Sequence, residues 1–227
     1  MSVEVCSYRL VLRGKPVGTH TLRTHRVGKV VELEAKLMLQ GGLGQQVVTQ
    51  LSRVHAESHH SLSFVELLQD RGERRQFDLA FDAERGLVRA GKGKDSAEVP
   101  YLRPYEDPLG LLHHLRQLPA TVRHLRVPML GKDVVVERLP DTVIEHPLGL
   151  RTARVYLLLP GGSYVYVDDE PPHIILKLTQ RLEGQLLDAL LVRVAQEMPV
   201  VQPDPEVERR SRRGRPKRRR RGRRRHA

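Results

Sequence analysis

VELEAKLMLQGGLG, residues 31–44, is the stretch that decides the predicted fold. Its apolar side chains at positions 31, 33, 35, 37 and 39 alternate with Glu32, Glu34 and Lys36. An alternation of period two indicates a strand with one buried face, because successive side chains of a strand point to opposite sides of the sheet. The glycine-rich end of the stretch, at 41–44, predicts a turn.

Short runs of the same kind precede and follow this strand, and each ends at turn residues. We expect further strands at 3–13, 19–27, 47–56, 61–69, 75–81, 121–127, 133–139, 141–146, 152–159, 164–167, 173–178 and 185–194. Gly14-Lys15-Pro16-Val17-Gly18 predicts the first turn, and the polar, glycine-containing residues 90–98 predict an exposed loop. Short strands joined by tight turns are typical of an antiparallel meander.

One stretch has a helical period instead. Asp107 suits a helix N-cap, Pro108 suits the first helical position, and Pro119 ends the helix. Between the two prolines, the leucines at 111, 112, 115 and 118 form one apolar stripe. The predicted fold class is therefore mainly β: a strongly curved antiparallel meander or partly closed barrel, with one helix at about 107–118 packed against it.

Composition divides the 227 residues into three parts. We expect a β domain at 1–198, a proline-rich acidic linker at 199–208 and a disordered, arginine-rich tail at 209–227. Cys6 is the one cysteine, so no intrachain disulfide can form. The sequence shows no signal peptide and no transmembrane segment, which predicts a cytoplasmic protein.

The tail carries the excess charge of the chain. Thirteen of the 39 basic side chains lie between Arg209 and Arg225, with no acidic residue among them; the other 26 face 27 acidic side chains. Such a run of like charges repels itself and favours a polyanion such as DNA or RNA. The expected nucleic-acid-binding residues are Arg209, Arg210, Arg212, Arg213, Gly214, Arg215, Pro216, Lys217, Arg218, Arg219, Arg220, Arg221, Arg223, Arg224 and Arg225.

Arg213-Gly214-Arg215-Pro216 resembles the core of an AT-hook. Glycine lets such a backbone enter a narrow minor groove, proline keeps it extended, and the arginines reach the negative floor. Arg221-Gly222-Arg223 lacks the proline. General phosphate binding is therefore the broader prediction, and AT-preferring groove binding is the narrower one.

Other candidate sites have simpler interpretations. His59-His60 and His113-His114 are adjacent pairs whose rings diverge, so neither pair chelates a metal alone. Asp168-Asp169-Glu170 is interpreted as a solvated turn and Cys6 as a small core residue. Gly41-Gly42-Leu43-Gly44 is not followed by a helix, so it lacks the context of a phosphate loop. We predict no catalytic, cofactor or metal site and no enzymatic activity.

Several features of the body resemble the bacterial domain of unknown function 3108 family. They are the glycine-bounded first turn, the Asp-Pro-Leu-x-x-Leu helix of Asp107 to Leu112 followed by Arg116, the hairpin from His146-Pro147-Leu148-Gly149 to Tyr156, and the final strand pair. The resemblance covers residues 3 to about 194 and implies a curved antiparallel sheet around one helix. It implies no known activity.

Two functions remain open at this point. The first is a non-enzymatic nucleic-acid-associated protein, in which a phosphate-binding tail tethers a β scaffold to nucleic acid, at the nucleoid or ribosome. The alternative is a carrier or binding module whose curved sheet holds a lipid or another small apolar ligand, while the tail docks to anionic surfaces. A protein partner of the body is also open.

Overall fold

The computed structural model describes residues 2–40, 45–147, 149–182 and 184–198. The fold given below is that of the compact unit Met1–Glu197. The predicted linker at 199–208 and tail at 209–227 lie outside the described residues.

The unit consists of one helix and fourteen strands of the described residues. These elements are β1 (Val3–Leu12), β2 (Lys15–Val27), β3 (Val30–Leu39), β4 (Gln46–His55), β5 (Ser61–Asp70), β6 (Glu73–Asp82), β7 (Leu87–Lys92), β8 (Asp95–Pro100), α1 (Pro108–Gln117), β9 (His124–Met129), β10 (Lys132–His146), β11 (Gly149–Leu159), β12 (Ser163–Asp168), β13 (Ile175–Leu182) and β14 (Gln185–Glu197).

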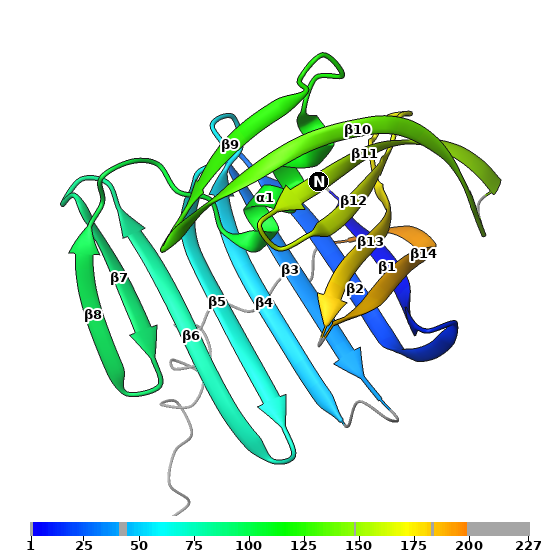
Figure 1. The fold of residues 1–227 in the computed structure, drawn as a ribbon. Coiled ribbons are helices and arrows are strands. Elements are labelled where there is room, and N and C mark those ends of the chain that lie inside the picture. The colour runs from blue at the N-terminus through cyan, green and yellow to red at the C-terminus, as the bar shows by residue number, and fades with distance from the viewer. Residues whose placement is uncertain (1, 41–44, 148, 183, 199–227) are drawn as a thin grey trace, which may run out of the picture. The chain divides into compact units, whose positions relative to one another are not determined.

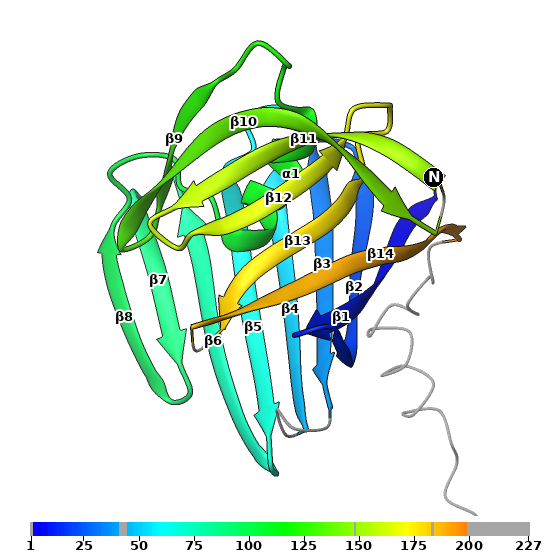
Figure 2. The same cartoon turned by 45° about the vertical axis from the view of Figure 1, so that its right-hand side comes forward.

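All the strands belong to one antiparallel sheet. Its order is β8-β7-β6-β5-β4-β3-β2-β1-β14-β13-β12-β11-β10-β9, so the first and last strands pair in the middle and join two meanders. The sheet curls until β9 to β13 pass across its concave face, with α1 between the two layers (Figures 1 and 2). Strands β8 and β9 form its two edges, so the sheet is not closed. The predicted fold class is confirmed.

The helix begins and ends for local reasons that the sequence encodes. Asp107 is the N-cap and accepts hydrogen bonds from the amides of Leu109 and Gly110, while Pro108 opens the first turn. Leu111 and Leu115 are buried on its apolar side. The helix contacts β3 and β4 in one layer and β12 in the other.

Two groups of buried side chains form the core, and α1 contributes to both. One group gathers around Tyr8 of β1, Leu115 of α1 and Tyr156 of β11, and it includes side chains of β9 to β14. The other gathers around Val54 and Phe64, under β3 to β8. The helix therefore links the two halves of the sheet.

One predicted turn and one predicted loop differ from the structure. The first turn is shorter than predicted, because β1 ends at Leu12 and β2 begins at Lys15. Gly18 lies inside β2 rather than in the turn, where a Cβ atom would fall 2.0 Å from the carbonyl oxygen of Met38. The predicted loop at 90–98 is wrong: it forms most of the β7–β8 hairpin, since pairing with β6 outweighs its weak strand propensity.

The predicted strands at 133–139 and 141–146 are one long strand, β10. Its pairing with β11 shifts register between Leu139 and Thr142, around Pro140. Proline cannot donate to the ladder, and a bulge accommodates it without ending the strand.

Candidate ligand-binding cavity

A cavity of about 230 Å³ lies beside α1, inside the curve of the sheet. Strands β2, β3 and β4 form one wall, β11, β12 and β13 form the opposite wall, and α1 and β9 complete it. The lining residues are His20, Ala35, Leu37, Val48, Gln50, Pro108, Leu109, Leu111, Leu112, Met129, Leu158, Ser163, Tyr164, Val165, Leu178 and Gln180.

The strand alternation decides which side chains face the cavity. Ala35 and Leu37 belong to the inward set of β3, and they pair directly with Gln50 and Val48 of β4. Leu37 and Val48 are only half-buried although they lie on the concave face, because part of their surface borders the cavity. The lining residues, all within the described part of the chain, include no Asp, Glu, Lys or Arg.

His20 is the one histidine among the described residues of this lining. It stands on β2 opposite Tyr8 and Leu37, and its ring lies 5.7 Å from the Tyr8 ring between centroids. Among the described residues, no hydrogen bond reaches either of its ring nitrogens. Burial lowers the pKa of His20 to about 4, so the imidazole is neutral at pH 7.

The start of α1 is fixed by a buried hydrogen-bond network. The hydroxyls of Ser52 and Ser61 donate to Oδ2 of Asp107 at 2.6 and 2.5 Å, and the amides of Leu109 and Gly110 donate to Oδ1 at 2.9 and 3.0 Å. Burial raises the pKa of Asp107, while these donors favour its charged form. The network ties the helix, and with it the cavity wall, to β4 and β5.

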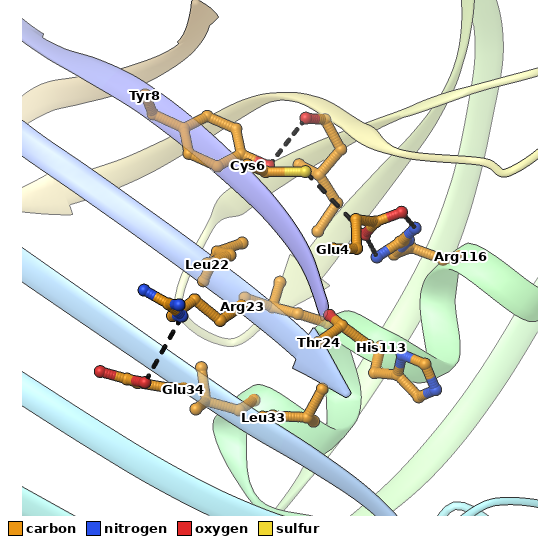
Figure 3. Close-up of a pocket in the computed structure, with 13 residues that line it drawn as sticks. Glu4, Cys6, Tyr8, Leu22, Arg23, Thr24, Leu33, Glu34, His113 and Arg116 are labelled. Atoms are coloured by element: carbon orange, nitrogen blue, oxygen red, sulfur yellow. Dashed lines mark hydrogen bonds and ion pairs between the residues drawn. The ribbon is translucent and has the colours of Figure 1, made fainter. Parts of the chain in front are cut away.

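The last turn of α1 is fixed by an ion pair. Arg116 forms a bidentate pair with Glu4 of β1, with N–O distances of 2.6 and 3.0 Å (Figure 3). It also donates to the carbonyls of His173 and Pro172 at 2.9 and 3.2 Å. The adjoining pocket measures about 30 Å³, room for no more than about two water molecules. This polar region therefore holds the helix rather than a ligand.

Cys6 and Tyr8 lie beside that ion pair and are not poised for reaction. Burial raises the pKa of the Cys6 thiol to about 11 and raises the pKa of Tyr8 well above its ordinary value. The Tyr8 hydroxyl donates to the carbonyl of Ile175 at 2.9 Å. Both side chains are packed core residues that stay neutral at pH 7.

Histidines from distant parts of the sequence meet against α1. The His59 ring stacks on His114 with 4.2 Å between centroids, and His113 meets it edge-on at 6.3 Å. His114 contacts Glu106 through Nδ1 at 2.8 Å. Sequence spacing gave no signal for this meeting, because the turn after β4 reaches the helix only in the fold. Burial lowers the pKa of His113 to about 4.

The remaining sequence candidates are structural or lie outside the described residues. Asp168 is buried at the end of β12 and accepts from the amide of Glu170 at 3.1 Å, while Asp169 pairs with Arg154 at 3.5 Å. Residues 41–44 and the tail residues 209–225 are outside the description. Among the residues that the structure describes, no group of three or more His, Cys, Asp or Glu side chains is arranged to hold a metal ion. No described helix has the length and apolar character needed to cross a membrane.

The fold and cavity define an open, β-barrel-like sheet around one helix. A crystal structure of a β-barrel-like protein of domain of unknown function DUF1849 from Brucella abortus is similar to this chain, with a TM-score of 0.58. The two share 9% sequence identity over 86% of this chain and 98% of that chain, a likeness that concerns the fold alone. Comparison with family models and with curated proteins gave no match.

The resemblance to the domain of unknown function 3108 family is wrong. No family model matches the chain, and the similar solved structure belongs to DUF1849. The features that suggested it have a general physical cause. A glycine turn between strands and an Asp-Pro helix start, here Asp107-Pro108, satisfy backbone requirements in many β folds.

Proposed function

We propose that the compact unit is a non-enzymatic binding module for a small, largely apolar ligand. The observation that carries the proposal is the cavity of about 230 Å³, whose lining is largely apolar and contains no Asp, Glu, Lys or Arg. An apolar cavity of about 150 Å³ stays dry and takes up benzene, so this one has room for a somewhat larger molecule. Burial of the ligand's apolar surface would contribute about 25 cal/mol per Å².

Binding of ethylbenzene tests this proposal. We expect amide resonances on β2 to β4 and on β11 to β13 to shift saturably when ethylbenzene is added to the full-length protein. Val48→Phe should abolish these shifts, because the larger side chain fills the cavity from β4. Thr49→Phe is the matched control, because Thr49 follows Val48 on β4 and its side chain points to the opposite face of the sheet.

Two results would contradict the proposal. One is the absence of saturable binding to the wild-type protein. The other is equal binding by wild type and Val48→Phe, which would place ethylbenzene elsewhere.

A second function is supported by the sequence of the tail. We propose that residues 209–225 bind DNA or RNA through their phosphates, since thirteen basic side chains stand there without an acidic one. Engaging six to ten phosphates would lower affinity by roughly 10³–10⁵ between 50 and 200 mM salt. This would place the protein in the cytoplasm, at the nucleoid or ribosome, with the cavity in the body as a separate site.

Fluorescence anisotropy with labelled DNA and RNA at several salt concentrations tests the tail. Full-length protein should show the steep salt dependence, and a chain ending at Glu208 should lose most of its affinity. Equal affinity of the two chains would reject the proposal. Comparison of an AT-rich duplex, a GC-rich duplex and single-stranded RNA then shows which nucleic acid is preferred.

A further inference from the structure

His20 borders a second, smaller space as well as the main cavity. A second hollow of about 10 Å³ is lined by His20, Leu37, Leu178 and Gln180, which also line the main cavity. The imidazole and the Gln180 amide are therefore the polar groups that border both spaces. Leu111, Leu112 and Met129 come from α1 and β9 and supply apolar surface elsewhere in the lining.

The state of this imidazole restricts what it can bind. A neutral ring has one N–H donor and one acceptor nitrogen, and neither has a protein partner among the described residues. In this largely apolar lining, a ligand group that hydrogen-bonds to the half-buried ring gains free energy that an apolar group of the same shape does not. A hydroxyl can donate to one nitrogen or accept from the other, and so suits either tautomer.

The charge of the lining restricts the ligand further. A carboxylate or ammonium group inside an apolar cavity needs an opposite charge to offset its desolvation. The described lining residues supply none, because their polar members are a neutral histidine, amides and hydroxyls. Fatty-acid anions and amines are therefore disfavoured.

We propose that the ligand is an uncharged amphiphile that carries a hydroxyl group, and that His20 forms the hydrogen bond to that hydroxyl. The inference rests on the proposed binding function of the cavity. It adds the chemical class of the ligand and the residue that selects it.

Three probes with the same ring and ethyl group separate the possibilities: 4-ethylphenol, ethylbenzene and 4-ethylbenzoate. Their affinities are measured at pH 7 by NMR titration of the full-length wild type, His20→Phe and His25→Phe. His25→Phe is the matched control, because His25 lies on the same strand beside Glu32 and does not line the cavity.

We expect His20→Phe to weaken 4-ethylphenol about tenfold and to change ethylbenzene by less than about twofold. His25→Phe should change neither probe. In the wild type, 4-ethylbenzoate should bind at least about tenfold more weakly than 4-ethylphenol.

The outcomes distinguish this inference from the proposed function. If ethylbenzene binds but His20→Phe leaves 4-ethylphenol unchanged, the role of His20 is overturned and the binding function stands. If 4-ethylbenzoate binds most tightly, the uncharged class is overturned. If no probe binds, both proposals fall together.

A measurement on the wild type covers the case in which His20→Phe does not fold. The ¹⁵N shift of one His20 ring nitrogen should move on addition of 4-ethylphenol and stay in place with ethylbenzene. Equal behaviour with both probes would overturn the proposed hydrogen bond.

Discussion

Replacing Asp107 with alanine should destabilise the protein more than any exposed aspartate does. The carboxylate is 2% exposed and accepts four hydrogen bonds, two from Ser52 and Ser61 and two from the first turn of α1. Alanine removes the N-cap and leaves two buried hydroxyls without their acceptor. The change therefore acts on the helix and on its attachment to β4 and β5 together.

The expected loss in the free energy of unfolding is the sum of the contributions of the N-cap and of the two hydroxyls. Loss of an N-cap costs about 1 kcal/mol, and each buried hydroxyl left without a partner costs about 1–3 kcal/mol. Relief from burying the charge of Asp107 offsets part of this sum, because burial raises the pKa of that carboxyl. We expect a net loss of about 3 kcal/mol in the free energy of unfolding.

Urea unfolding followed by circular dichroism measures this loss. Asp95→Ala, at an exposed aspartate on β8, is the control and should change stability by less than about 0.5 kcal/mol. The triple variant Asp107→Ala, Ser52→Ala, Ser61→Ala also removes the two hydroxyls that lose their acceptor. It should recover about half of the lost free energy of unfolding. A loss below about 1 kcal/mol for Asp107→Ala, or a triple variant less stable than Asp107→Ala, would refute the reasoning.

Three further predictions concern buried ionisable groups. Arg116→Met should lower the free energy of unfolding by about 3 kcal/mol, because it leaves the Glu4 carboxylate without its partner. Adding Glu4→Gln should recover most of this loss in the same urea assay, and the absence of recovery would argue against a stabilising ion pair. The Cys6 thiol, with its pKa raised to about 11, should not react with a disulfide reagent at pH 8 until the protein is unfolded; rapid reaction of the native protein would contradict its burial. His20 and His113 have folded pKa values of about 4 against 6.5, so the unfolded state takes up their protons first. Stability should be full above pH 6.5 and fall toward pH 4 by on the order of 2 kcal/mol per group, and His20→Phe should show a shallower fall.

The sequence predicted the parts of the fold that local physics decides. The alternation at 31–44 indicated the strand β3, and Asp107, Pro108 and Pro119 marked the ends of the helix. These signals are local because side-chain period and capping depend on neighbouring residues. The hairpin at 87–100 escaped prediction because its strand propensity is weak and its pairing with β6 stabilises it.

The cavity could not be predicted from the sequence, because its lining looks like ordinary core. Leu37 and Val48 follow the same alternation as buried strand residues, and nothing local shows that the space between the layers is unfilled. His20 likewise looks like any polar residue within THTLRTHR at 19–26. Only the crossing of β9 to β13 over the concave face brings these side chains around one space.

The same arrangement explains why the cavity exists. A fourteen-stranded sheet that curls over one ten-residue helix encloses more space than the helix fills. Larger side chains at Ala35 or Val48 would fill part of this space. A small alanine, half-buried leucines and an imidazole without a side-chain partner border one space, an arrangement that favours a site completed by a ligand. A ligand at about 100 times its dissociation constant would stabilise the protein by about 2.7 kcal/mol.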